Sequence, residues 1–482
     1  MNLARGAARG AAWNFATVLV ERSFGFIILG LLLRVIPASA VGLIAIASAI
    51  SDLARVVANS GAGEQVQADP GNRSVEAGAF WNQLLASLLF MGVLFVVAPF
   101  IASLYDQPKL SLVLRIMALN VVMTSFLIVP SARLTSKFRF KALGMISLGS
   151  TVAGGLVALP LAFSGHGIAA LVWQRMVGVG FYALAASIVA RWVPPRPPSF
   201  AVLRQGFRFS RPLMEAAFVD YISVTGYVML VGLRMSVADL GVFRVAQRLA
   251  EVLLEVAFMP ARKVFMPVFV AVQHDVHRRY ETTRQMLDLL GMIIFFVSAV
   301  CGAAAKPIVL LMFGARWEAA VPVFAIVTLM APAAALYSVI NPMLAAAGHT
   351  RLVSRYAWLN AATIAAAAWF GAPYGLKALA WALAGRGVVA AVLFGRAMRQ
   401  GLERPAAPIL RLLALPCVSF VAARLAGYAV LAALPGLGLA AQLVVGGAVS
   451  ASVFALVSFV LARRRVLGMT VRLHRALVGG VA

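Results

Sequence analysis

The chain has 482 residues, of which 62% are hydrophobic and only 12% are charged, and its mean hydropathy is +0.93. A soluble protein of this length cannot bury so large an apolar fraction, so the composition excludes the soluble classes and indicates a polytopic membrane protein. The formal net charge of +26 would also fit a nucleic-acid partner. The distribution of the basic residues along the chain decides between these two explanations.

Apolar windows long enough to cross a bilayer recur along the whole chain, and we count about fourteen. They cover residues 11–33, 40–62, 79–104, 110–131, 142–163, 167–190, 207–232, 241–262, 286–312, 319–346, 352–372, 377–397, 409–433 and 439–461. The first window resembles a cleavable signal peptide, but Glu21 and Arg22 interrupt it and another window follows at once. We therefore interpret it as the first span.

The basic residues gather in every second connection between these windows, as in the runs at 133–141, 191–211, 262–284 and 396–411 and in the tail at 463–475. The alternate connections carry few. This asymmetry is the positive-inside rule, and it predicts an even number of spans with both termini in the cytoplasm. The net charge therefore has a membrane explanation, and we expect no nucleic-acid partner.

Two sequence echoes indicate an internal duplication. "LLRVIPASAVG" ends at Gly42 and "GLRMSVADLG" ends at Gly241, and an acid lies ten residues beyond each glycine, at Asp52 and Glu251. Further along, "GIAALVW" echoes "GLKALAW". Duplicated six-span units build transporters that rock about a central site. The alternative is that the echoes reflect only the similar composition of any two membrane segments.

The stretch "RWVPPRPPSF" is the clearest linker, because its prolines favour a stiff, extended connector. We therefore expect an N-lobe at 1–190, a Pro-rich cytoplasmic linker at 191–206, a C-lobe at 207–400, and two further spans with a basic cytoplasmic tail at 401–482. The predicted fold class is an all-α polytopic membrane protein with two six-helix pseudo-repeat lobes plus two C-terminal helices.

Charged residues lie within the predicted spans. The stretch "FRVAQRLAEVLLEVAF" places Arg244, Arg248, Glu251 and Glu255 on one helical face, at spacings of 4, 3 and 4. The second window repeats these spacings, and the first and seventh windows add further charges. These residues are Ser48, Asp52, Arg55, Asn59, Glu21, Arg22, Glu215 and Asp220. Each charge facing lipid would cost about 2.5–3.5 kcal/mol, so we expect a hydrated central cavity.

The arginines of this cavity suit an anion, because guanidinium grips phosphate oxygens in a bidentate fork. The acids suit coupling to H⁺ or Na⁺, or gating. Pairing along each helix is the structural alternative, and it is favoured for four arginines outside the cluster: Arg115, Arg175, Arg386 and Arg424. We expect no metal site, because His274 and His277 lack an evident third ligand.

A series of motifs carries a family resemblance: "GAAWNFATVLVERSFGFIILGLLLRVIPASAVGL", "APFIASLYDQPKL", "VPSARLTSKFRFKAL", "GHGIAALVWQ", "LGVFRVAQRLAE", "KVFMPVFVAVQHD", "LMFGARWEAAVPVF", "AAAGHTRL" and "GAPYGLKALAWAL". In order and spacing, about residues 10–400 resemble the polysaccharide-transport flippases of the multidrug/oligosaccharidyl-lipid/polysaccharide (MOP) exporter superfamily.

The resemblance implies a transporter, not an enzyme, in the bacterial inner membrane. It would move a polyprenyl-diphosphate-linked oligosaccharide from the cytoplasmic to the periplasmic leaflet by alternating access, for lipopolysaccharide or exopolysaccharide biosynthesis. It implies Arg22, Arg55, Arg244 and Arg248 as substrate-binding residues, and Glu21, Asp52, Glu215, Asp220, Glu251 and Glu255 as coupling or gating residues. Expected partners are the lipid-linked glycan, membrane lipids, a glycan polymerase and a chain-length regulator, with no cofactor. The alternatives are a drug exporter of the same superfamily and a membrane polysaccharide polymerase.

Overall fold

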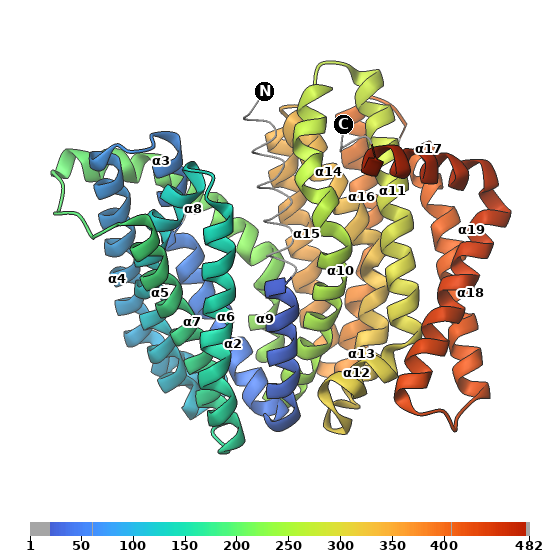
Figure 1. Ribbon diagram of the computed structural model, residues 1–482, viewed down its shortest axis with the longest axis horizontal. Helices are drawn as coiled ribbons and strands as arrows, with labels where there is room; N and C mark the ends of the chain where they lie inside the picture. The colour runs from blue at the N-terminus through green and yellow to red at the C-terminus, as the bar shows by residue number, and fades with distance from the viewer. Residues whose placement is uncertain (1–19, 60, 406, 479–482) are drawn as a thin grey trace. The chain divides into compact units, whose positions relative to one another are not determined.

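The computed structural model describes residues 20–59, 61–405 and 407–478, and these are almost entirely helical, with no β-strand among them (Figure 1). Their side chains are described except at 254–264, 267, 331–332, 334–335, 350 and 462–478. Contacts divide the chain into two compact units, Met1–Gly241 and Val242–Ala482. The boundary falls inside the long helix α10, and the lobe boundaries expected from the sequence stay a prediction.

The first unit begins with a helix over 20–35. It continues with α2 (Ala38–Asn59), α3 (Ala62–Ala68), α4 (Arg73–Leu104), α5 (Pro108–Ser136), α6 (Phe140–Phe163), α7 (Gly167–Ala190), α8 (Phe200–Thr225), α9 (Tyr227–Gly232) and the start of α10 (Val237–Ala271). Contacts between α4 and α5, between α6 and α7, and between α2 and both α5 and α8 hold it together.

The second unit contains the rest of α10 and the helices that follow. These are α11 (Val276–Ala303), α12 (Ala305–Phe313), η1 (Ala315–Trp317), α13 (Ala320–Val327), η2 (Thr328–Met330), α14 (Ala331–Ala346), α15 (Thr350–Gly371), η3 (Ala372–Tyr374), α16 (Leu376–Leu402), α17 (Ala407–Leu410), η4 (Arg411–Leu413), α18 (Ala414–Ala433) and α19 (Leu439–Val478). One of its core clusters includes Phe269 on α10, Leu290 on α11, Val339 on α14 and Phe394 on α16.

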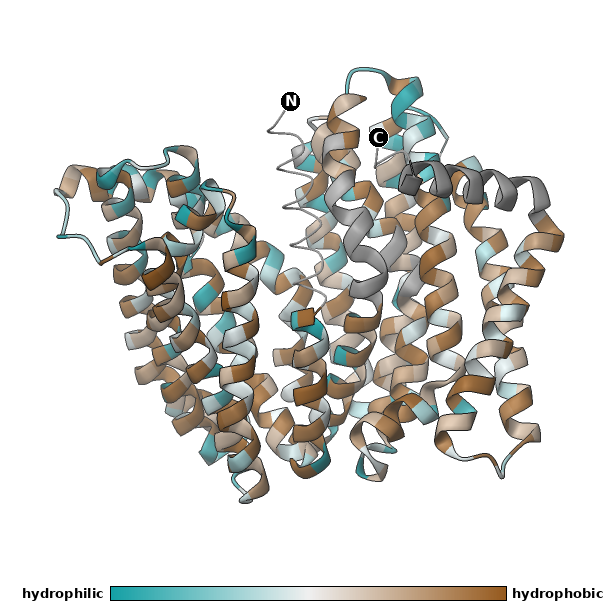
Figure 2. Cartoon of the chain, in the orientation of Figure 1, coloured by the Kyte–Doolittle hydropathy of each residue, from teal (hydrophilic) through white to brown (hydrophobic). Residues whose placement is uncertain are grey.

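Nine described helices are long and apolar enough to cross a membrane, and shorter apolar helices accompany them. Hydrophobic residues predominate along the helix bodies in Figure 2, and hydrophilic residues gather at ends such as the connection between α10 and α11. Every one of the predicted apolar windows overlaps a described helix. The chain is therefore a multi-pass membrane protein, and the count of about fourteen spans stays a prediction.

Several predicted spans are divided in the structure, as at 207–232 and 319–346, and the span at 286–312 also has the wrong boundaries. The window at 286–312 contains two helices, because α11 ends at Ala303 and α12 begins at Ala305, two residues before Pro307. Helix α11 also starts ten residues earlier than expected, at Val276. Its N-cap is Asp275, whose side chain accepts a hydrogen bond of 3.0 Å from the backbone N–H of Arg278. Hydropathy missed this polar first part of the helix, which the cap stabilises.

The linker after α7 is held against the first unit. Trp192 is buried, and its ring packs 5.2 Å from that of Phe80 on α4. The neighbouring Trp81 donates a hydrogen bond of 2.9 Å from Nε1 to the carbonyl oxygen of Pro195. Residues 192–199 contain no helix, and α8 begins at Phe200, inside the linker expected at 191–206.

The glycines that ended the two sequence echoes lie together in the first unit. A Cβ placed on Gly42 in α2 would lie 1.7 Å from the carbonyl oxygen of Val237, and one on Gly241 in α10 would lie 1.9 Å from that of Ala38. Both clashes are with backbone. The two helices therefore cross at a separation that only glycine allows at these positions.

Candidate functional site

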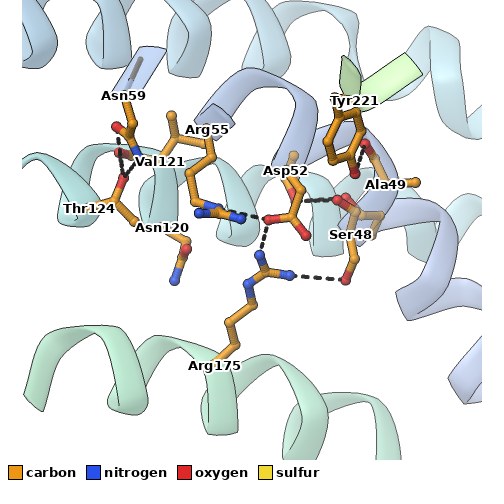
Figure 3. Close-up of polar contacts among 12 residues, drawn as sticks. Ser48, Ala49, Asp52, Arg55, Asn59, Asn120, Val121, Thr124, Arg175 and Tyr221 are labelled. Carbon is orange, nitrogen blue, oxygen red and sulfur yellow. Dashed lines mark hydrogen bonds and ion pairs between the residues drawn. The ribbon is translucent and has the colours of Figure 1, made fainter. Parts of the chain in front are cut away.

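The polar stripe of α2 forms the centre of a charged cluster in the first unit. Asp52 and Arg55 are one helical turn apart, and Nε of Arg55 donates to Oδ1 of Asp52 at 2.9 Å (Figure 3). Their side chains are 19% and 35% exposed, so the pair is partly shielded and still reachable by water or a ligand. This is the half-buried environment expected of a charged pair in a membrane transporter.

Helix α7 contributes a second arginine, Arg175, to this cluster, whereas the sequence places it outside the cluster. Arg175 forms an ion pair with Oδ1 of Asp52 and donates a hydrogen bond of 3.2 Å to Oγ of Ser48 (Figure 3). The sequence contains a hint of this role. Arg175 lies eight residues after Gly167, and Arg386 lies eleven residues after Gly375. The two offsets differ by about one helical turn, so both arginines occupy a similar face of their helices. Both arginines follow the second sequence echo.

The other end of the α2 stripe enters a network of neutral polar groups. Asn59 donates from Nδ2 to Oγ1 of Thr124 on α5 at 3.1 Å, and its Oδ1 accepts from Nε2 of Gln83 on α4 at 2.7 Å. Nearby, Ser125 donates to Ser87 at 3.0 Å. These bonds connect polar side chains of α2, α4 and α5 among apolar residues and help to fix the rotation of α2.

The stripe of α10 forms a corresponding cluster in the second unit. Arg248 contacts Oε2 of Glu251 at 3.2 Å, and Arg244 approaches Oε1 of the same carboxylate at 4.0 Å. Arg244 also donates to Oε1 of Gln247 at 2.9 Å. The predicted spacing therefore brings three of its four charged residues together, whereas the side chain of Glu255 lies outside the described residues.

The two clusters share one stoichiometry. In the first unit Arg55 and Arg175 share Asp52, and in the second Arg244 and Arg248 share Glu251. Among the described side chains, which do not include that of Glu255, each cluster thus holds one more guanidinium than carboxylate. A site of this composition attracts an anion, and the guanidinium fork suits phosphate oxygens.

Two acids of the predicted set do not join a cluster. Glu215 on α8 is exposed and pairs with Arg211 of the same helix at 3.0 Å. Asp220, on the same helix, is also exposed. Helical phase alone could not say which face of α8 is covered. Glu21 and Arg22 lie at the start of the described chain and are partly exposed.

Other charges inside or near the spans have local structural partners. Arg133 at the end of α5 binds Glu76 at the start of α4 in a bidentate pair, with Nε to Oε1 at 2.6 Å. Arg115 on α5 donates from Nε to the carbonyl oxygen of Phe95 at 3.4 Å. That carbonyl lies four residues before Pro99, which has no N–H to bond it.

The two histidines that the sequence predicts not to bind a metal have polar neighbours. His274 contacts Gln273 at 3.0 Å and His277 contacts Arg404 at 3.2 Å. Within the described part of the chain, no group of three or more His, Cys, Asp or Glu residues could hold a metal ion.

The helical membrane fold and its intramembrane charges define the class of multi-pass membrane transport proteins. The family model described as "Polysaccharide biosynthesis protein" matches residues 31–322, and the chain belongs to this family. It is 23% identical to the succinoglycan biosynthesis transport protein ExoT of Rhizobium meliloti, over 78% of this chain and 77% of ExoT. It is 20% identical to the lipopolysaccharide biosynthesis protein WzxC of Escherichia coli, over 71% of this chain and 70% of WzxC.

Solved structures confirm the predicted MOP-type fold. The lipid II flippase MurJ, in an inward closed conformation, matches with a TM-score of 0.73 at 12% identity, over 93% of this chain and 98% of MurJ. A multidrug MATE transporter of the MOP superfamily, in an inward-facing conformation, matches with a TM-score of 0.63 at 13% identity, over 81% of this chain and 96% of that chain. ExoT is by name a transport protein, which supports the prediction of a transporter rather than an enzyme.

Proposed function

We propose that this protein is a flippase that moves a polyprenyl-diphosphate-linked oligosaccharide across the bacterial inner membrane, from the cytoplasmic to the periplasmic leaflet. Membership of the polysaccharide biosynthesis family supports the glycan as cargo. The names of ExoT and WzxC support a role in exopolysaccharide or lipopolysaccharide biosynthesis.

The observation that carries the proposal is the excess of arginine over carboxylate among the described side chains of each cluster, clearest where Arg55 and Arg175 share Asp52. A diphosphate is the most highly charged part of such a substrate and needs charge-assisted hydrogen bonds once it leaves water. We assign diphosphate or acidic-sugar binding to the four predicted arginines: Arg22, Arg55, Arg244 and Arg248. Coupling or gating is assigned to the six predicted acids: Glu21, Asp52, Glu215, Asp220, Glu251 and Glu255.

Several further features belong to the same proposal. Both termini lie in the cytoplasm, as the positive-inside pattern suggests. Two six-helix lobes, divided by the linker at 191–206, alternate access to a central site, with H⁺ or Na⁺ as the coupling ion. A glycan polymerase and a chain-length regulator act on the exported unit.

The proposal is tested by binding measurements on the purified protein in nanodiscs. The ligands are a polyprenyl-diphosphate oligosaccharide, an uncharged polyprenol and a cationic dye. Arg55→Ala and Arg248→Ala each remove one charge-assisted contact, so we expect binding about ten- to a hundredfold weaker. Arg284→Ala is the matched control, because Arg284 also pairs with an acid at i−3, Glu281, but on the polar first part of α11.

The outcomes separate the alternatives. Diphosphate-dependent binding that weakens in the two cluster variants and not in Arg284→Ala supports the flippase. Binding of the cationic dye alone indicates a drug exporter of the same superfamily. Equal binding of the uncharged polyprenol contradicts recognition of the diphosphate.

A further inference from the structure

Arg424 on α18 donates three hydrogen bonds, and transport of the glycan does not explain it. Its Nη1 donates to Oγ1 of Thr328 at 2.9 Å, and its Nη2 donates to the carbonyl oxygen of Ala325 at 2.6 Å and to Oη of Tyr428 at 3.0 Å. The three acceptors come from α13, η2 and α18 itself, and all are neutral. The guanidinium is therefore fixed in place while its charge stays uncompensated by them.

The surroundings of Arg424 reinforce this position. Tyr428 donates to the carbonyl oxygen of Gly302 on α11 at 2.9 Å, so the ring that meets the guanidinium is itself held. A Cβ on Gly302 would lie 2.6 Å from Nη1, so the glycine leaves room for the charged group. A charge inside a membrane-spanning segment is costly and is retained chiefly where it serves a ligand or a partner.

Arg424 lines a cavity of about 800 Å³ that lies wholly within the second unit, among α12, α13, α16, α18 and α19. Lys306, in the first turn of α12, lines the same cavity and is exposed. No hydrogen bond or ion pair of Lys306 occurs in the described part of the chain, and none of the described lining residues is Asp or Glu. Two positive charges therefore face one cavity that has no acid in its described wall.

The rest of the cavity wall is largely apolar, with Pro322, Leu329 and Leu431 among its residues. Trp381 is also part of it and is 56% exposed, as is common for tryptophan at the level of lipid headgroups. A small inorganic anion would leave this apolar wall uncovered. The wall and the two cations together fit an amphipathic ligand with an anionic end.

A hydroxyl-bearing headgroup fits the remaining polar group. Gln442 on α19 lines the cavity and uses its Nε2 to donate to the carbonyl oxygen of Leu437 at 2.9 Å. Its carboxamide oxygen stays available as an acceptor among the described residues. The cavity has the size of a site for one drug-sized molecule, which suits a phosphoglycerol headgroup with the upper part of its acyl chains and not a diphosphate carrying several sugars.

We propose that this cavity binds the phosphate headgroup of an anionic glycerophospholipid, with Arg424 and Lys306 on the phosphate and the acyl chains along the apolar wall. The site is separate from the clusters assigned to the translocated glycan. In this proposal a bound lipid joins the last two helices, α18 and α19, to the other helices of the second unit.

The test is native mass spectrometry of the full-length protein with added lipids. The probes are dioleoylphosphatidylglycerol, dioleoylglycerol, which lacks the phosphate, a polyprenyl phosphate and inorganic phosphate. We expect phosphatidylglycerol to bind, and Lys306→Gln or Arg424→Gln to weaken it about tenfold. Lys377→Gln is the matched control, because Lys377 is an exposed lysine in the first turn of α16 that does not line the cavity.

Arg424→Gln also removes bonds between helices, so Lys306→Gln is the decisive variant if Arg424→Gln fails to fold. Unchanged binding in Lys306→Gln would overturn the proposal. So would equal binding of dioleoylglycerol, which would make the cavity a neutral lipid contact. A preference for the polyprenyl phosphate would assign the cavity to the transported lipid, and binding of inorganic phosphate with equal strength would make it a site for free anions.

Discussion

Gly42 and Gly241 meet at the crossing of α2 with the start of α10, where the amide nitrogen of each lies within 3.0 Å of the position that a Cβ on the other would take. The two residues are 199 positions apart, and each ends one of the two matching sequence echoes. Each of the two matching segments thus includes a glycine, and these glycines let the two helices approach closely.

We predict that Gly42→Ala and Gly241→Ala destabilise the protein by about 3 kcal/mol or more, at the upper end of overpacking costs, because each new methyl group meets backbone that cannot rotate away. The measurement is thermal unfolding in detergent. Gly92→Ala is the control, because Gly92 lies in α4 with nothing within 4 Å of its would-be Cβ. A melting temperature of Gly42→Ala equal to that of the parent would contradict the crossing.

The ion pair between Asp52 and Arg175 is expected to contribute more than an exposed pair. Asp52→Asn leaves two partly buried guanidinium groups without their carboxylate, so we predict a coupling energy between the two residues of about 1–3 kcal/mol in a double-mutant cycle. The matched pair is Arg211 with Glu215, whose side chains are 70% and 65% exposed. Its coupling should be about 0–1 kcal/mol. Equal coupling energies for both pairs, measured by unfolding in mixed micelles, would refute this ranking.

Loss of the pair between Glu76 and Arg133 should lower the free energy of unfolding more than loss of the pair between Asp52 and Arg175. Glu76 is 3% exposed, so Arg133→Ala leaves a buried carboxylate alone, and we predict a loss of about 3–5 kcal/mol in the free energy of unfolding. Combining Arg133→Ala with Glu76→Gln removes the charge and should restore part of the stability. No recovery in this double variant would show that packing of the arginine, and not its charge, is what matters.

Asp275 should make the stability depend on pH. The backbone N–H of Arg278 bonds its carboxylate at the N-cap of α11 and lowers its pKa below the ordinary value of aspartate. Because the folded pKa is the lower one, the charged cap stabilises the fold above the ordinary aspartate pKa. This contribution is lost as the pH falls through the lowered pKa. Asp275→Asn keeps a capping oxygen but cannot ionise.

The measurement for Asp275 is the melting temperature of the parent and of Asp275→Asn across the acidic range. The parent should be the more stable protein at neutral pH, and the difference should vanish as the pH falls. Parallel curves for the two proteins would rule out a role for this carboxylate charge.

Hydropathy predicted the helices well, because a bilayer requires long apolar segments whatever their tertiary contacts. Helical phase also predicted that Asp52 and Arg55, and that Arg248 and Glu251, would face the same way. It could not predict the partner of Arg175, since this depends on how α7 packs against α2. It could not predict the exposure of Glu215 either, because period alone does not reveal which face of a helix its neighbours cover.

Pro99 and Arg115 lie on different helices, yet the structure makes each depend on the other. A residue with a backbone N–H at position 99 would donate to the carbonyl oxygen of Phe95 and leave the guanidinium of Arg115 without this acceptor. A neutral residue at position 115 would in turn leave that carbonyl without its donor. The two positions should therefore covary: related sequences without proline at position 99 should also lack arginine at position 115.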